Sequence, residues 1–400
     1  MTADGSSPPR GDQDFSRSPG WLSVGGVAVN RGRNVARKLK SDRVLFTATF
    51  LLVCVSVVMV FSASALVALE RFDQPDLFLI KQALWSVLGL AVLAIVMRID
   101  YRTYRSDVVI TGLLAFVGLL LVAVLFSPSV NGSRRWFGLG GLGIQPSELA
   151  KVACVLFTAL MLERRMHRIN EVAYSLLGIA LVCGLAVGLI LLQPDMGTAL
   201  SLAFIVGVMV FSAGLSYVYV GAATVIVVPS VLVLIWSEQY RWDRVMAFLD
   251  PWADPLGHGF QLIQSMIAVG SGGVFGKGLM AGVQKLFYVP EPHTDFIYAV
   301  IGEELGLLGT TAVLVCFGVI AWRGLRIADK AEDAFGAFLA LGLTTMIAAQ
   351  AFINMSVVLG LLPTKGLALP LLSNGGSSLL VNLLGMGILL NISQHEAVDG

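Results

Sequence analysis

The stretch VLFTATFLLVCVSVVMVFSASALVAL, Val44 to Leu69, runs for 26 residues without a charged side chain. An α-helix rises about 1.5 Å per residue, so about 20 apolar residues cross the hydrocarbon core of a bilayer. The stretch is too long, and too far from the start of the sequence, to be the apolar part of a signal peptide. We therefore expect a retained transmembrane helix.

The composition of the whole chain also favours lipid as its solvent. Of 400 residues, 56% are hydrophobic and only 13% are charged, and the mean hydropathy is +0.81. Soluble domains carry roughly a quarter charged residues, so this chain has too little polar surface to cover a water-soluble globule. A soluble enzyme, a secreted disulfide scaffold and a disordered protein are excluded. The net charge of +1 offers no basic excess for nucleic acid.

Further apolar stretches of similar length follow the first. The expected spans are Leu77–Met97, Val108–Phe126, Leu142–Leu162, Val172–Leu192, Met196–Ser212, Leu215–Trp236, Leu305–Trp322, Phe335–Leu362 and Gly376–Ile392. Together with the first span they make ten, which places both chain ends on one side of the membrane. We predict an all-α polytopic membrane protein whose ten-helix domain covers residues 44–393, between a disordered tail, residues 1–43, and a short tail, residues 394–400.

The distribution of positive charge predicts the orientation. The first tail and the loops on its side contain seventeen of the 27 Lys and Arg residues. Cytoplasmic loops carry such an excess, so both tails are expected in the cytoplasm. The one long segment between spans, residues 237–304, then faces outward, and its aromatic residues predict short helices at the membrane surface.

The segment KLFYVPEPHTDFIYAVIGEEL, just before and within the approach to a span, gathers ionisable residues. They are Lys285, Glu291, His293, Asp295, Glu303 and Glu304. Such groups are costly at a membrane boundary unless they are used, which indicates a functional site. Thr294 or Asp295 could instead be the N-cap of the next helix, and spacing alone favours this cap for Asp295.

Other polar residues on the outer side also allow two interpretations. Glu148 and Lys151 are spaced i,i+3 in a helix, so they could neutralise each other or contact a ligand. Asp195 is best read as a helix cap. Arg134 and Arg135 fit lipid-headgroup anchors as well as ligand contacts.

Several separated motifs resemble the SEDS family of membrane glycosyltransferases, named for shape, elongation, division and sporulation. The resemblance runs from about Val44 to Ile392. It rests on SASA, KQALW, NGSRRWFGLGGLGIQPSELAK, QPDMGTA, RVMAFLDPWADPLGHGFQLIQS, GSGGVFGKGL, QKLFYVPEPHTDFIYAVIGEELG and GLLPTKGLALPLLS. HTDFIYAVIGEELG and GLLPTKG favour the division-type branch over the elongation-type branch. Asn374 departs from the Tyr that the family usually has, and Leu279–Val283 is less glycine-rich than usual.

The resemblance implies a peptidoglycan glycosyltransferase of the bacterial cytoplasmic membrane. Such an enzyme polymerises lipid II into glycan strands at the outer face during cell division, with inversion at C1 and undecaprenyl pyrophosphate as the leaving group. Asp295 matches the family's essential aspartate, and it would act either as general base or as ligand of a divalent cation, Mg or Mn. The expected substrate-binding residues are Lys151, Lys285, Arg134, Glu148, His293, Lys365 and Ser377.

The resemblance also implies partners, and two rival functions remain open. The expected partners are a class B penicillin-binding transpeptidase and other membrane proteins of the division machinery, and no nucleic acid. A lipid II flippase and a non-enzymatic division scaffold are the alternatives. A flippase needs a polar path to both faces, whereas the polar residues of this sequence gather on the outer side, which favours the polymerase.

Overall fold

The computed structural model describes residues 41–128, 133–139, 142–283 and 293–395. Everything described below belongs to the unit of residues 38–400. The predicted disordered tail, residues 1–43, lies almost wholly outside the described residues, and so does most of the predicted tail at residues 394–400.

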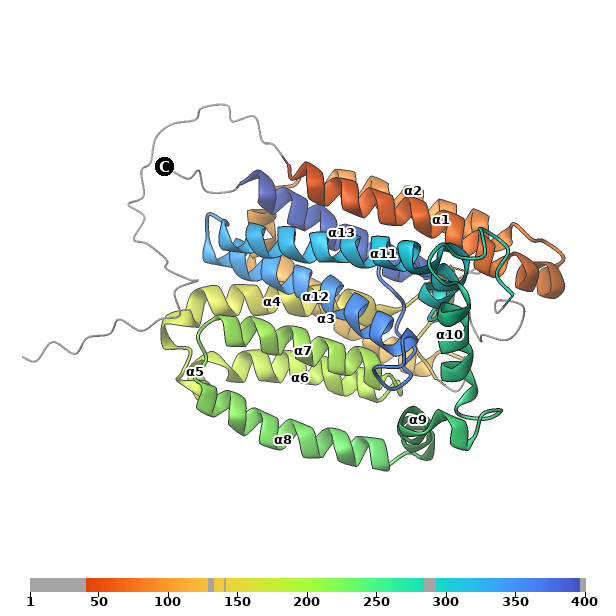
Figure 1. Cartoon of the computed structure of the whole chain (residues 1–400). Coiled ribbons are helices and arrows are strands. Elements are labelled where there is room, and N and C mark those ends of the chain that lie inside the picture. Colours follow the sequence, from red (N-terminus) through yellow and green to blue (C-terminus); the bar gives the residue numbers. More distant parts are fainter. Residues whose placement is uncertain (1–40, 129–132, 140–141, 284–292, 396–400) are drawn as a thin grey trace, which may run out of the picture. The chain divides into compact units, whose positions relative to one another are not determined.

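Long helices that run side by side make up most of the described fold (Figure 1). They are α1 (Arg43–Phe72), α2 (Leu77–Val96), α3 (Asp107–Ala123), α4 (Pro146–Arg165), α6 (Leu177–Leu191), α7 (Met196–Ser212), α8 (Tyr217–Trp236), α11 (Ile297–Asp329), α12 (Ala334–Val358) and α13 (Gly376–Gln394). Each corresponds in order to one of the predicted spans.

Shorter elements connect these helices. They are η1 (Tyr101–Arg105), η2 (Val124–Phe126), η3 (Met166–Arg168), α5 (Val172–Ser175), α9 (Gln239–Leu249), η4 (Pro251–Ala253) and α10 (Phe260–Ser271), with the strands β1 (Phe137–Leu139) and β2 (Leu142–Ile144). The two strands pair antiparallel, with Phe137 opposite Ile144. The long outer segment thus contains the short helices α9 and α10, as its aromatic residues predicted.

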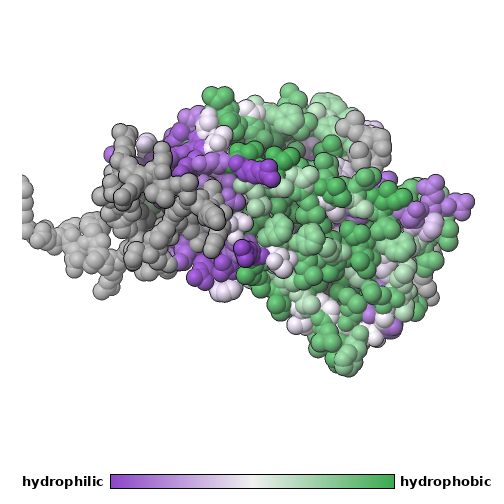
Figure 2. Space-filling view, turned by 90° about the horizontal axis from the view of Figure 1, so that it is seen from above, coloured by the Kyte–Doolittle hydropathy of each residue, from purple (hydrophilic) through white to green (hydrophobic). Residues whose placement is uncertain are grey.

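Seven of the described helices are long and apolar enough to cross a membrane: α1, α2, α3 continued by η2, α8, α11, α12 and α13. Two further predicted spans, α6 and α7, are shorter, with 15 and 17 residues. The remaining one, α4, has 20 residues but carries charged side chains at both ends. The flank of the helices presents a broad hydrophobic surface, with hydrophilic side chains toward the ends (Figure 2). The protein is therefore a multi-pass membrane protein.

Close helix packing concentrates around α13, which packs against α2. Gly376, Gly89 and Gly387 allow this approach, because a Cβ on Gly376 would lie 2.1 Å from the Trp85 ring and one on Gly89 would lie 2.4 Å from Leu383. Small residues let helix backbones approach in membranes, where dispersion contacts drive association. By contrast, α8 has no buried residue. The core therefore lies along α12 and α13, and α8 lies at the edge of the bundle in Figure 1.

One end of the bundle carries both ends of the described chain, and we call it the terminal end. There, Ser393 Oγ accepts a hydrogen bond from Asp42 N at 3.0 Å, and Asn391 Oδ1 accepts one from Tyr101 N at 2.8 Å. Arg102 pairs with Glu332 at 2.6 Å. The opposite end, called the Asp295 end, holds the outer segments of the sequence prediction.

Two predicted spans begin differently in the structure. The span expected over Leu142–Leu162 starts at Pro146, because Leu142–Ile144 pairs as a strand and Pro146 occupies the first turn, where its missing N–H costs nothing. The span expected over Val172–Leu192 is divided into α5 and α6. Ser175, at the division, donates from Oγ to the Arg168 carbonyl at 2.6 Å, so a side chain closes this turn.

A glycine divides α11. Gly306 has φ 66° and ψ −159°, so the backbone leaves the helical conformation and re-enters it. The predicted span Leu305–Trp322 corresponds to the part after this break, and it extends further, to Asp329. The part before the break, from Ile297, was expected to belong to the outer segment and is instead a buried helical turn that carries Glu303 and Glu304.

Candidate active site

The segment His293–Asp295 is fixed by hydrogen bonds to three consecutive backbone carbonyls. Asn374 N donates to His293 O at 2.9 Å, and Ser373 Oγ donates to Thr294 O at 2.6 Å. Asn354 Nδ2 donates to Asp295 O at 2.8 Å. Helix α12 and the segment before α13 therefore hold this turn in place, so the Asp295 side chain projects from a rigid backbone.

The Asp295 carboxylate is half-buried and lies over the loop that contains Lys365 and Gly366. A Cβ built on Gly366 would lie 3.1 Å from Asp295 Oδ2. The N-cap position of α11 is occupied by Phe296, which makes no side-chain cap hydrogen bond. Helix α11 thus begins one residue later than a cap at Asp295 predicts.

His293 is buried at the same turn. Its ring lies 4.8 Å from the ring of Phe78, which is on α2. The aromatic contact ties the start of the turn to α2, so this segment is held by α2 as well as by α12.

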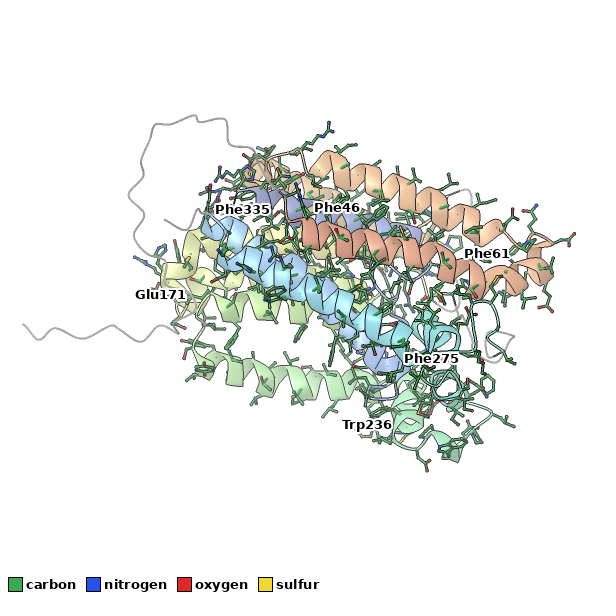
Figure 3. The ribbon with its side chains drawn as sticks, turned by 45° about the horizontal axis from the view of Figure 1, so that its top comes forward. Phe46, Phe61, Glu171, Trp236, Phe275 and Phe335 are labelled. Carbon is green, nitrogen blue, oxygen red and sulfur yellow. The ribbon has the colours of Figure 1, made fainter. Side chains whose placement is uncertain are left out.

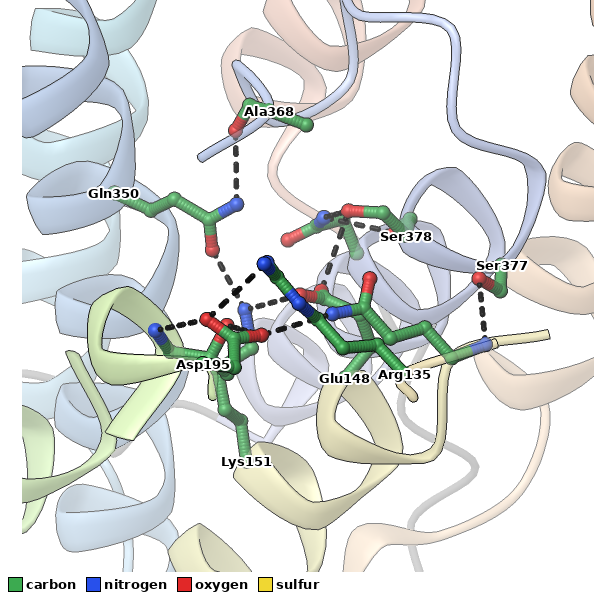
Figure 4. Close-up of polar contacts among 11 residues, drawn as sticks. Arg135, Glu148, Lys151, Asp195, Gln350, Ala368, Ser377 and Ser378 are labelled. Atoms are coloured by element: carbon green, nitrogen blue, oxygen red, sulfur yellow. Dashed lines mark hydrogen bonds and ion pairs between the residues drawn. The ribbon is translucent and has the colours of Figure 1, made fainter. Parts of the chain in front are cut away.

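Lys151 lies in a buried polar cluster that joins three helices (Figure 4). Its Nζ is 2.9 Å from Glu148 Oε1 and donates to Gln350 Oε1 at 2.6 Å. Glu148 Oε2 accepts a hydrogen bond from Ser378 Oγ at 3.2 Å, and Gln350 Nε2 donates to Ala368 O at 2.9 Å. The sequence left two interpretations open for Glu148 and Lys151, and the structure shows the ion pair between them.

Asp195 caps α7, as predicted. Its side chain accepts hydrogen bonds from Thr198 N at 3.1 Å and from Thr198 Oγ1 at 2.8 Å. It also accepts one from Gln145 Nε2 at 3.3 Å and lies 3.7 Å from Arg135 Nη1 (Figure 4). Burial lowers the pKa of Lys365, and the negative charge of Asp195 partly opposes this effect. Asp195 thus balances the cations of this cluster.

The other predicted substrate-binding residues are distributed unevenly. Ser377 Oγ accepts a hydrogen bond from Gln145 N at 3.2 Å and so joins the Asp195 cluster. Arg134 is exposed and donates from Nη1 to Leu125 O at 2.9 Å, so it caps the end of η2. Lys285 lies outside the described residues.

A third cluster surrounds the break in α11. Glu303 and Glu304 are fully buried, and Glu303 Oε1 lies 2.8 Å from Lys277 Nζ. Glu304 accepts a hydrogen bond from Ser62 Oγ at 2.7 Å and one from Met280 N at 3.1 Å. The loop after α10 and helix α1 therefore supply partners for these two buried carboxylates.

Sequence reasoning did not identify Gln350 and Asn354. Gln350 accepts a hydrogen bond from Lys151, and Asn354 donates one to the Asp295 carbonyl. They are amides four residues apart in helix α12, which has no charged residue, so they occupy one face of it. Amide side chains are costly in a membrane span unless they have partners, and their spacing was the available signal.

No group of three or more His, Cys, Asp or Glu side chains that could hold a metal ion occurs within the described ranges. Asp295 alone could still supply one carboxylate to a cation shared with a ligand, since Mg²⁺ is often bound by one or two carboxylates and by substrate phosphates.

The fold and the site define a polytopic helical membrane protein with a rigidly held aspartate at one end of its bundle. Residues 42–398 match the cell cycle protein family model of FtsW, RodA and SpoVE. The chain belongs to this family, the SEDS family that its motifs resemble.

Individual relatives agree over most of the chain. A probable peptidoglycan glycosyltransferase FtsW of Geobacter sp. (strain M18) is 42% identical over 353 residues, which are 88% of this chain and 96% of the relative. The stage V sporulation protein E of Bacillus subtilis (strain 168) is 41% identical over 364 residues, 90% of this chain and 99% of the relative.

Solved structures share the fold. A chain from a study of polymerization and crosslinking by a peptidoglycan synthase complex superimposes with a TM-score of 0.74 at 33% identity, covering 90% of this chain and 100% of that one. The rod shape determining protein RodA of Thermus thermophilus gives a TM-score of 0.67 at 29% identity, covering 90% of this chain and 99% of RodA.

Proposed function

We propose that this protein is a peptidoglycan glycosyltransferase that polymerises lipid II at the outer face of the bacterial cytoplasmic membrane during division. The observation that carries the proposal is the Asp295 turn, whose three carbonyls are hydrogen-bonded to α12 and to the segment before α13. A rigid backbone keeps the carboxylate in reach of a reacting group, and such positioning is a large part of catalysis.

The proposed orientation follows from charge. The loops at the terminal end carry Arg98, Arg102, Arg105, Arg164, Arg165, Arg168, Arg323, Arg326 and Lys330. An excess of Lys and Arg is typical of the cytoplasmic side, so the Asp295 end faces outward.

The proposed reaction is a direct displacement with inversion. A hydroxyl of the acceptor sugar attacks C1 of the donor sugar, the bond from C1 to the pyrophosphate oxygen breaks, and undecaprenyl pyrophosphate leaves with the electron pair. The hydroxyl proton passes to the Asp295 carboxylate. A general base in this role contributes on the order of a hundredfold or more.

The leaving pyrophosphate needs positive charge close to Asp295. Lys365 is adjacent to Gly366, over which the Asp295 carboxylate lies. Arg135 lies beside Asp195 in the neighbouring cluster. Positioned cations stabilise charge that develops in the transition state, and they do so more strongly where water is excluded. A divalent cation, Mg or Mn, would supply Lewis-acid stabilisation of the pyrophosphate, and Asp295 would then be its ligand in place of the proton acceptor.

The proposal includes a transpeptidase partner that cross-links the glycan. The similar solved chain comes from a peptidoglycan synthase complex, which supports a class B penicillin-binding transpeptidase as partner. Other division membrane proteins are proposed as further partners.

The test is glycan synthesis by the purified chain with lipid II, the partner and a divalent cation, with products resolved by length. Long glycan is expected. A parallel assay in vesicles measures lipid II translocation. Translocation without any glycan product would favour the flippase, and neither activity would favour the scaffold.

A further inference from the structure

A cavity of about 780 Å³ lies at the terminal end, far along the helices from the Asp295 turn. It opens between α1, α2 and the end of α13, and its lining is Phe46, Phe50, Leu90, Leu93, Ala94, Met97, Arg98, Asp100, Asn391, Gln394 and His395. Phe46 lies on α1 toward the end that carries Phe335 and Glu171 (Figure 3). None of the residues proposed for glycan synthesis lines this cavity.

The cavity has an apolar body and a polar mouth. Leu93 is buried at the wall, whereas Phe46 and Phe50 are exposed on the flank that faces lipid and have ring centroids 6.2 Å apart. Arg98 and Asp100 follow the end of α2, where a membrane helix meets the headgroups. The volume of the cavity is in the range of ligand-binding sites. Its lining is mostly apolar with a few polar groups, as in ligand-binding sites generally.

Most polar groups at the mouth already have partners. Asp100 Oδ1 accepts a hydrogen bond from Arg102 N at 2.9 Å. Asn391 Nδ2 donates to Met97 O at 2.9 Å, and its Oδ1 accepts from Tyr101 N. His395 Nδ1 donates to the Asn391 carbonyl at 3.0 Å.

Arg98 is different, because its exposed guanidinium makes no hydrogen bond or ion pair to any residue within the described ranges. A cation with free donors at the mouth of an apolar cavity between membrane helices matches an anionic lipid headgroup, since basic pockets at the cytoplasmic side bind such headgroups. An amphiphile without a phosphate would leave these donors unused, and in a zwitterionic lipid the ammonium group offsets the attraction of the phosphate to Arg98.

We infer that this cavity is a binding site for an anionic phospholipid of the leaflet at the terminal end. An acyl chain lies between Phe46, Phe50 and Leu93, and the phosphate lies against Arg98. A lipid in this site would contact α1, α2 and the end of α13.

The test is native mass spectrometry of the full chain in mild detergent, titrated with phosphatidylglycerol or with phosphatidylcholine of the same acyl chains. The wild type is expected to bind phosphatidylglycerol more tightly than phosphatidylcholine. Arg98→Gln is expected to weaken the binding of phosphatidylglycerol about tenfold, which corresponds to one charge-assisted hydrogen bond, and to weaken the binding of phosphatidylcholine less, because the choline ammonium group already offsets the charge of its phosphate. Arg326→Gln is the matched control, because Arg326 is exposed at the same end and does not line the cavity.

A second variant tests the cavity itself. Ala94→Phe fills the lining from α2 and should weaken the binding of both lipids, whereas Ala91→Phe, exposed on the same helix outside the lining, should not. Equal binding of the two lipids by the wild type, or an equal loss in Arg98→Gln and Arg326→Gln, overturns the inference. Unchanged binding in Ala94→Phe also overturns it.

Discussion

The backbones of Gly276 and Gly306 are in close contact. A Cβ on Gly306 would be 2.3 Å from Gly276 N, and a Cβ on Gly276 would be 2.1 Å from Glu304 O. Both residues have positive φ, 78° and 66°. The loop after α10 can therefore follow the break in α11, where Lys277 N donates to Glu303 O at 3.0 Å and Gly278 N to Glu304 O at 3.0 Å.

Gly306→Ala is expected to destabilise the protein and to abolish most glycan synthesis, because its Cβ meets backbone atoms that cannot move aside. Thermal unfolding in detergent and the lipid II assay measure the two effects. Gly318→Ala is the matched control in the same helix, since a Cβ there meets nothing within 4 Å. Equal unfolding temperatures and equal glycan synthesis in the two variants would contradict the importance of the break at Gly306.

Gly366→Ala should act on Asp295 with little effect on stability. The added Cβ would lie 3.1 Å from Asp295 Oδ2, so the carboxylate must shift by a few tenths of an ångström. Glycan synthesis is expected to fall about tenfold, because catalytic geometry is sensitive to small displacements. Gly221→Ala, with open space around it, is the control. Unchanged glycan synthesis by Gly366→Ala would contradict this prediction, because the reaction would then not depend on the exact position of the Asp295 carboxylate.

Lys151→Met should be strongly destabilising, because it leaves Glu148 buried without its cation. Removal of one partner of a buried pair costs about 3–5 kcal/mol. The double variant Glu148→Gln with Lys151→Met should lose less than the sum of the single variants. Arg164→Met, which removes the exposed pair with Asp107, should cost no more than about 1 kcal/mol. If the double variant lost as much stability as the two single variants together, the ion pair between Glu148 and Lys151 would not contribute to stability.

The lowered pKa of Lys365 predicts an upper pH limit for glycan synthesis. Burial lowers the pKa of its ammonium group, so the positive charge is lost at a pH below the usual value of about 10.4. If this charge holds pyrophosphate, glycan synthesis declines as the pH rises through the lowered pKa. Lys365→Arg keeps its charge and should extend activity to higher pH. A pH profile that is the same in both proteins would exclude this role.

The sequence allowed the number and order of the spans to be predicted, because long apolar runs identify helices that need no partner to satisfy their backbone. The break at Gly306 could not be predicted in the same way, since an isolated glycine in an apolar run is compatible with a continuous helix. The start of α4 at Pro146 depended on strand pairing with Phe137–Leu139, which the short apolar run Leu142–Ile144 does not indicate.

The site was predicted in part. His293 and Asp295 were identified by the gathering of ionisable residues and by the family motif. Their supports were not, because Asn354 is 59 residues and Ser373 79 residues from the carbonyls that they bind. Hydrogen bonds over such separations follow from the packing of helices, and no local pattern encodes them.

The most direct test of the proposed function compares Asp295→Asn with the wild type in glycan synthesis from lipid II, with the partner and a divalent cation present. Asp107→Asn, at the terminal end, is the matched control for loss of one carboxylate. Asp295→Asn is expected to fold normally, to bind lipid II and to lose at least about a hundredfold in rate. Normal production of long glycan by Asp295→Asn would contradict the central claim.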